Sequence, residues 1–270
     1  GTATGEVCFN TSITGYQEII SDPSYAEQII NFTFPHVGNV GTNKEDHESD
    51  KVWTKGVIIN AEITDPSNYR SLKHLDHWLK NNKIVGITGI DTRNLTNFIR
   101  DKGAPKGTIS FIKDKNFNLK KLLKITQNWS GLKNLDLAKK VTTKKNYVWK
   151  DLRTWKKGKG FTINKKRILH VVAIDYGIKK NILRYFSDFK CEVNIVSCKT
   201  SAEKILKMKE QDCRTIALEV GMQNGGLASG IALEMGKVSS VGLAPAVFGP
   251  WMNISGSSLA YWWREKNRVF

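Results

Sequence analysis

The stretch ILHVVAIDYG, residues 168–177, is the feature that most restricts how this chain can fold. It is an almost uninterrupted apolar run that ends in glycine, which is typical of a buried parallel strand. A helical pattern follows it, then the strand pattern CEVNIVSC and a second helical pattern that opens at Thr200 and Ser201. This order of strand, helix, strand and helix predicts an α/β fold, with the start of a doubly wound sheet in residues 168–211.

The part before residue 142 predicts a separate domain of mixed β/α type. Alternating apolar residues indicate strands in 5–12, 55–63 and 108–112, and 14–34 combines a turn with a further strand. Helical spacing indicates helices in 71–82, 89–103 and 118–126. The helix in 89–103 has Asp91 or Thr92 as its cap and Gly103 after its end.

Two composition changes divide the rest of the chain. Residues 142–167 are basic and have no sustained apolar period, so we interpret them as a linker between domains. Lysines become rare after about Arg214, and glycine, alanine and serine become frequent. Residues 207–226 therefore look like a seam between two kinds of sequence, and 212–270 are expected to form a small-residue-rich apolar tail. No run in that tail reaches the roughly 18 uncharged apolar residues of a membrane span.

Charge and cysteine content limit the function classes. The net charge is +17, but the lysines are scattered and no recognition motif accompanies them, so we expect no nucleic-acid partner. The four cysteines form no C-x-x-C pair, and we expect no secretory signal, which together favour a cytoplasmic location. His74 and His77 lie three residues apart, but no third ligand accompanies them, so we expect no metal site.

The long stretch FNTSITGYQEIISDPSYAEQIINFTFPHVGNVGTNKED resembles the small, glutamine-hydrolysing subunit of carbamoyl-phosphate synthetase. The resemblance continues through GITGIDTRNLTNFIRDKGAPKGTI and HVVAIDYGIKKNILRYFSDFK, and it covers about residues 1–210. It implies an N-terminal domain of that subunit in 1–141 and a class I glutamine amidotransferase domain that begins at 168. It also implies that further residues precede Gly1 in the complete subunit.

In that family the small subunit releases ammonia from glutamine and passes it to a large subunit, which makes carbamoyl phosphate for arginine and pyrimidine synthesis. The resemblance therefore implies the large subunit and glutamine as partners. It implies no cofactor in this chain, since ATP and Mg²⁺ act in the large subunit. The serine of the DPSY motif contacts glutamine in the family, and that position is Ser24 here.

The chain departs from the family pattern where its catalytic residues should follow. The amidotransferase chemistry needs a cysteine on a tight elbow, with a histidine that takes its proton and a glutamate that orients the histidine. Cys213 has no flanking glycines, and all five histidines lie before residue 171. We therefore expect a truncated amidotransferase domain in 168–211, no catalytic residue and no glutaminase activity.

The tail has a resemblance of its own. EVGMQNGGLA and the residues around it are similar to the end of a bile acid:sodium symporter family transporter, which suggests a chimera joined near 210–214. Two further hypotheses therefore stay open beside a truncated synthetase subunit. One is a non-catalytic module that docks on the large subunit, and the other is a transporter fragment. A membrane partner is expected only if the tail is genuine.

Overall fold

The computed structural model describes residues 1–112 and 116–206, and these fall into two compact units. The first unit contains Gly1–Thr143, Leu152–Thr162 and Asp175–Tyr185, and the second contains Lys144–Asp151, Ile163–Ile174 and, within the described residues, 186–206. The α/β class predicted from the sequence is confirmed, with element order β9, α6, β10 and α7 in 169–206. The expected tail, 212–270, and Cys213 lie outside the described residues.

The first unit is built on a five-stranded sheet with the order β4-β3-β2-β1-β5. Strands β1 to β4 pair in parallel, and β5 runs antiparallel to β1. The strands are β1 (Thr2–Asn10), β2 (Gln28–Phe32), β3 (Gly56–Ile58), β4 (Val85–Ile87) and β5 (Lys106–Ser110). The helical segments are α1 (Tyr16–Ser21), η1 (Pro23–Tyr25), α2 (Leu75–Asn81), α3 (Thr92–Lys102), α4 (Leu119–Asn128) and α5 (Leu137–Val141).

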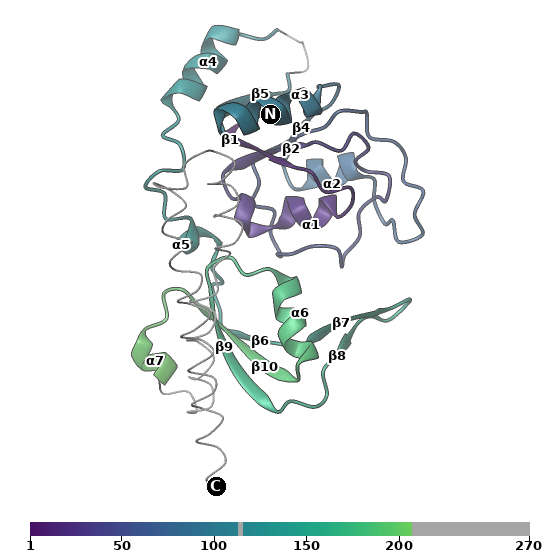
Figure 1. Ribbon diagram of the computed structural model, residues 1–270, viewed down its shortest axis with the longest axis vertical. Coiled ribbons are helices and arrows are strands. Elements are labelled where there is room, and N and C mark those ends of the chain that lie inside the picture. The colour runs from purple at the N-terminus through teal and green to yellow at the C-terminus, as the bar shows by residue number, and fades with distance from the viewer. Residues whose placement is uncertain (113–115, 207–270) are drawn as a thin grey trace. The chain divides into compact units, whose positions relative to one another are not determined.

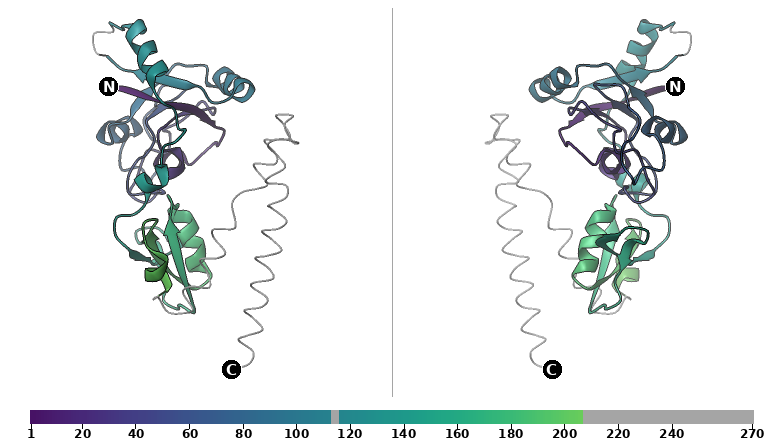
Figure 2. Two further views of the ribbon diagram at one scale, coloured as in Figure 1. Left: turned by 90° about the vertical axis from the view of Figure 1, so that its left-hand side faces the viewer. Right: turned by 90° about the vertical axis from the view of Figure 1, so that its right-hand side faces the viewer.

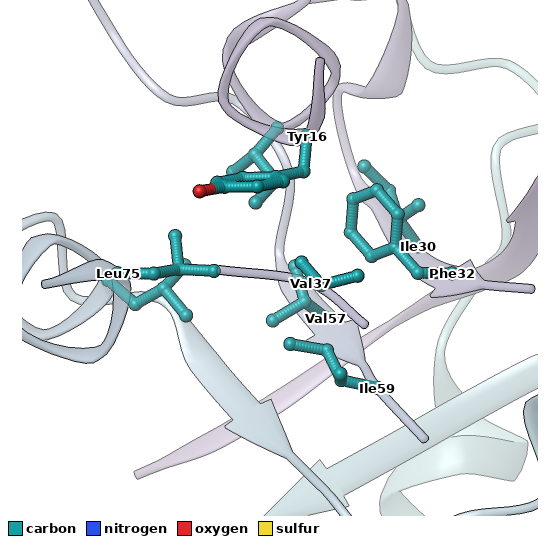
Figure 3. Packing of buried hydrophobic residues seen from close by; sticks show 9 residues of the cluster. Tyr16, Ile30, Phe32, Val37, Val57, Ile59 and Leu75 are labelled. Carbon is teal, nitrogen blue, oxygen red and sulfur yellow. The ribbon is translucent and has the colours of Figure 1, made fainter. Parts of the chain in front are cut away.

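Helices cover both sides of this sheet, as Figures 1 and 2 show. On one side, Ile30 and Phe32 of β2 pack with Tyr16 of α1 and Leu75 of α2 (Figure 3). On the other side, Ile29 of β2 packs with residues of β1, β5 and α3. Because neighbouring side chains of a strand point to opposite faces, β2 is apolar on both, and each fully buried large side chain contributes roughly 1.5–3 kcal/mol.

The second unit contains a three-stranded sheet with the order β6-β10-β9, in which β6 runs antiparallel to β10. The strands are β6 (Tyr147–Trp149), β9 (Leu169–Asp175) and β10 (Cys191–Ser197), and β10 is followed by the helix α7 (Ala202–Leu206). The helix after β9, α6 (Lys180–Asp188), belongs to the first unit as far as Tyr185. Val172, Val196 and Ile205 form a buried cluster. Cys191, at the start of β10, is also buried.

Three expectations from the sequence need correction. Residues 16–21 form a helix, α1, where only a turn and a strand were predicted. The helix predicted in 71–82 begins at Leu75, because the Nδ1 atom of His74 accepts a hydrogen bond from the backbone N–H of Asp76 and caps it. The strand predicted in 55–63 is regular only in β3.

The basic range 142–167, interpreted as a linker, contains regular structure. It holds β6 and the two strands β7 (Asp151–Lys156) and β8 (Gly160–Ile163), which pair with each other. Lysines alternate there with Trp149, Trp155 and Phe161, so the range has strand-forming residues but little apolar periodicity. The domain limits drawn from the sequence stay a prediction.

Candidate functional site

The site predicted from the sequence centres on Ser24, which lies in the single turn of η1. Asp22 precedes this turn, and its Oδ1 atom accepts a hydrogen bond from the backbone N–H of Ser24 at 2.9 Å. Pro23 lies in the first turn of η1, where a backbone N–H would have no partner within the helix, so its absence in proline costs no hydrogen bond. The local sequence Asp-Pro-Ser is therefore sufficient to build the turn, and it leaves Ser24 exposed while Asp22 is buried.

A lysine from a distant part of the first unit fixes the Asp22 carboxylate. The Nζ atom of Lys179 lies 2.7 Å from Oδ2 of Asp22, so each carboxylate oxygen has its own partner. Burial opposes the charge on Lys179, but the hydrogen bond and charge of Asp22 outweigh it and raise the pKa of Lys179. Lys179 therefore carries its positive charge throughout the physiological pH range.

The backbone before Lys179 fits closely against the Ser24 turn. Gly177 has a φ of +100°, and a Cβ there would lie 2.8 Å from Val141 and 3.1 Å from Pro23. The Oδ1 atom of Asp175 accepts the backbone N–H groups of Gly177 at 2.8 Å and Ile178 at 2.9 Å. Only glycine meets both demands at position 177, a left-handed backbone and no side chain.

Among the described residues, the side chains near Ser24 supply no nucleophile. The Tyr25 hydroxyl accepts a hydrogen bond from Nδ2 of Asn10 at 2.9 Å, and burial raises the pKa of Tyr25. Burial also raises the pKa of the Cys8 thiol to about 12, so this cysteine stays protonated and unreactive at neutral pH. The corner can therefore offer a hydroxyl as a hydrogen-bond partner, and the described residues around it hold no acyl-transfer machinery.

The other candidate groups do not join this corner. The rings of His74 and His77 are 5.9 Å apart in an edge-to-face arrangement, and the described residues contain no group of three metal-ligating side chains. His170 belongs to the second unit, where its Nδ1 atom lies 3.7 Å from Oε1 of Glu192. Within the described ranges, no helix is both long and apolar enough to cross a membrane.

The family resemblance points to Ser24 but not to the residues that position it. Asp22 carries a local signal, since an aspartate two residues before a serine can accept its N–H. Lys179 carries none, because its partner lies far away along the chain and a lone lysine in a basic sequence does not stand out.

Known proteins are similar to the N-terminal part of this chain. Residues 1–109 match the family model described as "Carbamoyl-phosphate synthase small chain, CPSase domain". The carbamoyl phosphate synthase small chain of Bradyrhizobium diazoefficiens is 51% identical over 213 residues, which are 77% of this chain and 54% of that protein. The small chains of Bartonella quintana and Mesorhizobium japonicum are 50% and 49% identical over 212 and 213 residues, again 77% of this chain and 53% of each relative.

The chain thus spans about half the length of the curated relatives it matches. These matches confirm the resemblance to the carbamoyl-phosphate synthase small chain over 77% of the chain, and the family model covers its first 109 residues. The resemblance of the tail to a symporter stays a prediction.

Proposed function

We propose that this chain is part of the small, glutamine-hydrolysing subunit of a carbamoyl-phosphate synthase, which supplies ammonia from glutamine for arginine and pyrimidine synthesis. The observation that carries the proposal is the 51% identity over 213 residues, because it extends well beyond the 109 residues of the family domain. In this role the chain works in the cytoplasm beside a large subunit. That subunit uses ATP and Mg²⁺, and this chain needs no cofactor of its own.

Within that function, Ser24 is proposed to contact glutamine through its hydroxyl group. Its geometry supports the role, since the side chain is exposed while its backbone is held by Asp22 and, through Asp22, by Lys179. One hydrogen bond contributes only about 0.5–1.5 kcal/mol, so Ser24 would orient glutamine in a pocket completed by other residues.

The chain itself is proposed to be inactive as a glutaminase. No histidine follows His170 in the sequence, and two of the three described cysteines, Cys8 and Cys191, have raised pKa values because they are buried. Neither can supply the thiolate that attacks an amide. The chain would then act as a docking module for the large subunit, which is the second function that the same observations favour.

A reconstitution experiment tests both statements. The purified chain is mixed with a carbamoyl-phosphate synthase large subunit, and complex formation is followed by size-exclusion chromatography. We expect a complex that makes carbamoyl phosphate from ammonium chloride but not from glutamine. Absence of a complex would contradict the family role of this chain. Glutamine-dependent ammonia release that is lost in Cys213→Ser would instead contradict its inactivity.

The tail of the chain is proposed to be foreign to the rest, joined near 210–214. The change in composition supports this, since the sequence after Arg214 contains only two lysines, Lys237 and Lys266. A single long DNA read across codons 200 to 225 tests it. An uninterrupted read would establish a genuine fusion, and partition of the chain into detergent would then favour the transporter hypothesis. A read that continues into a Gly-Pro-Gly loop and a cysteine elbow would show the tail to be an artefact.

A further inference from the structure

The first unit contains a cavity of about 360 Å³ that no residue of the turn η1 lines. It lies between α1, the loop that follows Thr42, and α2, and this volume falls in the range of small-molecule sites. Neither Ser24 nor Lys179 lines it, so the proposed glutamine contact does not account for it.

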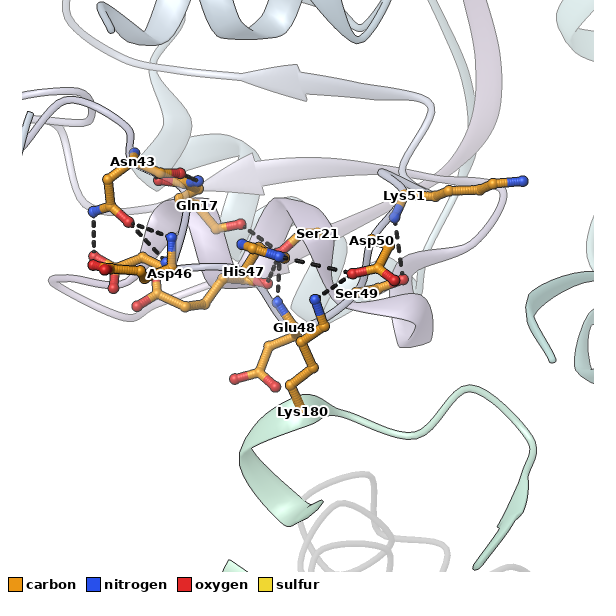
Figure 4. A network of polar contacts seen from close by, with 12 residues as sticks. Gln17, Ser21, Asn43, Asp46, His47, Glu48, Ser49, Asp50, Lys51 and Lys180 are labelled. Carbon is orange, nitrogen blue, oxygen red and sulfur yellow. Dashed lines mark hydrogen bonds and ion pairs between the residues drawn. The ribbon is translucent and has the colours of Figure 1, made fainter. Parts of the chain in front are cut away.

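One wall of the cavity is held rigidly by reciprocal hydrogen bonds. The side-chain amide of Gln17 donates to the carbonyl oxygen of Asn43 at 2.7 Å and accepts the Asn43 N–H at 2.9 Å. The Oγ atom of Ser21 accepts the backbone N–H of Glu48 at 2.9 Å (Figure 4). The loop from 43 to 48 is therefore tied at both ends to α1, and a ligand would meet a wall that is already in place.

The charge in the cavity is positive, because its lysines stand apart while nearby carboxylates are engaged. Asp50, which also lines it, pairs with Lys180, and the two residues approach one another in Figure 4. Lys44, Lys51 and Lys73 line the cavity, and none forms an ion pair with any residue in 1–112 or 116–206, although the Nζ atom of Lys51 lies 5.9 Å from the centre of the Trp53 ring. Three lysines in the lining of one hollow give it a positive potential, which attracts an anion.

His47 adds no charge to this arrangement at neutral pH. Burial and the nearby charge of Lys180 together lower its pKa, although Asp50 acts in the opposite direction. The imidazole ring is therefore neutral at pH 7, and the positive potential comes from the lysines.

Another part of the lining is apolar. Trp78, Leu72 and Val52 line the cavity, and Leu72 is 63% exposed. Trp78 and Val52 also pack against the buried cluster around Leu75, which holds them in place. An aromatic surface beside lysines suits a ligand that carries a flat apolar group next to its negative charge.

We propose that this cavity binds a small anion in which a phosphate group is attached to a planar ring, with the phosphate at Lys44, Lys51 and Lys73 and the ring at Trp78 and Leu72. The observation that selects this class is the combination of unpaired lysines and an apolar wall in one hollow of fixed shape. A free phosphate would leave the apolar wall in water, and a neutral ring would leave the lysines without a partner.

Isothermal titration calorimetry of the full chain with phenyl phosphate tests the proposal. Phenol, which has only the ring, and inorganic phosphate, which has only the charge, are titrated as controls. We expect phenyl phosphate to bind with a stoichiometry of one and at least about tenfold more tightly than either half, a difference of about 1.4 kcal/mol. Inorganic phosphate that binds as tightly as phenyl phosphate would overturn the proposal for the ring. Phenol that binds as tightly would overturn it for the lysines.

Variants locate the binding. The triple substitution Lys44→Gln, Lys51→Gln and Lys73→Gln should weaken phenyl phosphate at least about tenfold, and Leu72→Ala, at an exposed position that is safe for folding, should weaken it by a smaller factor. Lys102→Gln is the matched control, because Lys102 is an exposed lysine of α3 that does not line the cavity. Unchanged affinity in the triple variant would overturn the site, and so would an equal loss in Lys102→Gln, which would show general charge attraction.

Discussion

Strands β2 and β10 lie inside the two sheets, but they are buried in different ways. In β2, Ile29, Ile30, Asn31 and Phe32 are all buried, because helices cover both faces of the first sheet. In β10 the pattern alternates at first, with Cys191, Val193 and Ile195 buried and Glu192 and Asn194 half-buried. A continuous apolar run thus indicates a strand that is buried on both faces, and an alternating pattern indicates a strand that is buried on one face.

The largest expected effect comes from removing the biggest side chain of β2. Phe32→Ala should destabilise the first unit by about 3–5 kcal/mol, because Phe32 is fully buried and the sheet cannot close over the cavity. Hydrogen exchange, measured segment by segment, should show lost protection in β1 to β3 and unchanged protection in β9 and β10. An equal loss of protection in both sets of strands would mean that the two units unfold together. It would contradict the view that β2 and β10 belong to separately stabilised sheets.

A polar residue at the same kind of position gives a sharper test. Asn31 of β2 is fully buried, and its Nδ2 atom donates to the carbonyl oxygen of Thr92 and to Oγ1 of Thr96, both at 2.9 Å. Asn31→Ala should therefore cost about 1–3 kcal/mol, whereas Asn194→Ala in β10 should cost under about 0.5 kcal/mol. Urea unfolding measures both. Similar costs for the two asparagines would show that their strands are equally enclosed.

A smaller effect is expected at the Ser24 turn. Asp22→Ala removes the cap of η1 and the partner of Lys179, and it should cost about 1–2 kcal/mol. Asp76→Asn breaks an exposed pair with Lys80 on α2 and is the control, with an expected cost of about 0.3–0.5 kcal/mol. Thermal unfolding distinguishes them, and an Asp22→Ala variant as stable as the control would mean that the turn does not depend on its carboxylate.

The smallest effect is a dependence of stability on pH. Burial lowers the pKa of His47 in the folded chain, so the unfolded chain takes up a proton first as the pH falls below 6.5. Stability should decrease through that window, and His47→Gln should flatten the decrease between pH 7.5 and 6. Burial raises the pKa of Glu18, which acts in the opposite sense but is the same in both proteins. Identical slopes would rule out His47 as the source.

The sequence predicted the ends of a helix well where capping residues mark them. The sequence predicted Asp91 or Thr92 as the cap of α3 and Gly103 after its end, and in the structure Asp91 is the cap and Gly103 follows the helix. The helix α1 was missed because Asp22 and Pro23, which form the next turn, dominate its surroundings. The pairing of Lys179 with Asp22 was also missed, since it depends on tertiary contacts that no local pattern encodes. Ser24 remains a prediction from resemblance, although its exposure agrees with the proposed role.

The order of strands in the first sheet has a consequence for synthesis on the ribosome. β1 pairs with β2 only about two dozen residues later, but its other neighbour is β5, so that Thr2 meets Ser110. One side of β1 therefore stays without a partner while β2, β3 and β4 are made, and an open strand edge readily pairs with other chains. Nascent chains arrested before residue 106 should bind chaperones and aggregate on release, and chains arrested well beyond residue 110 should not.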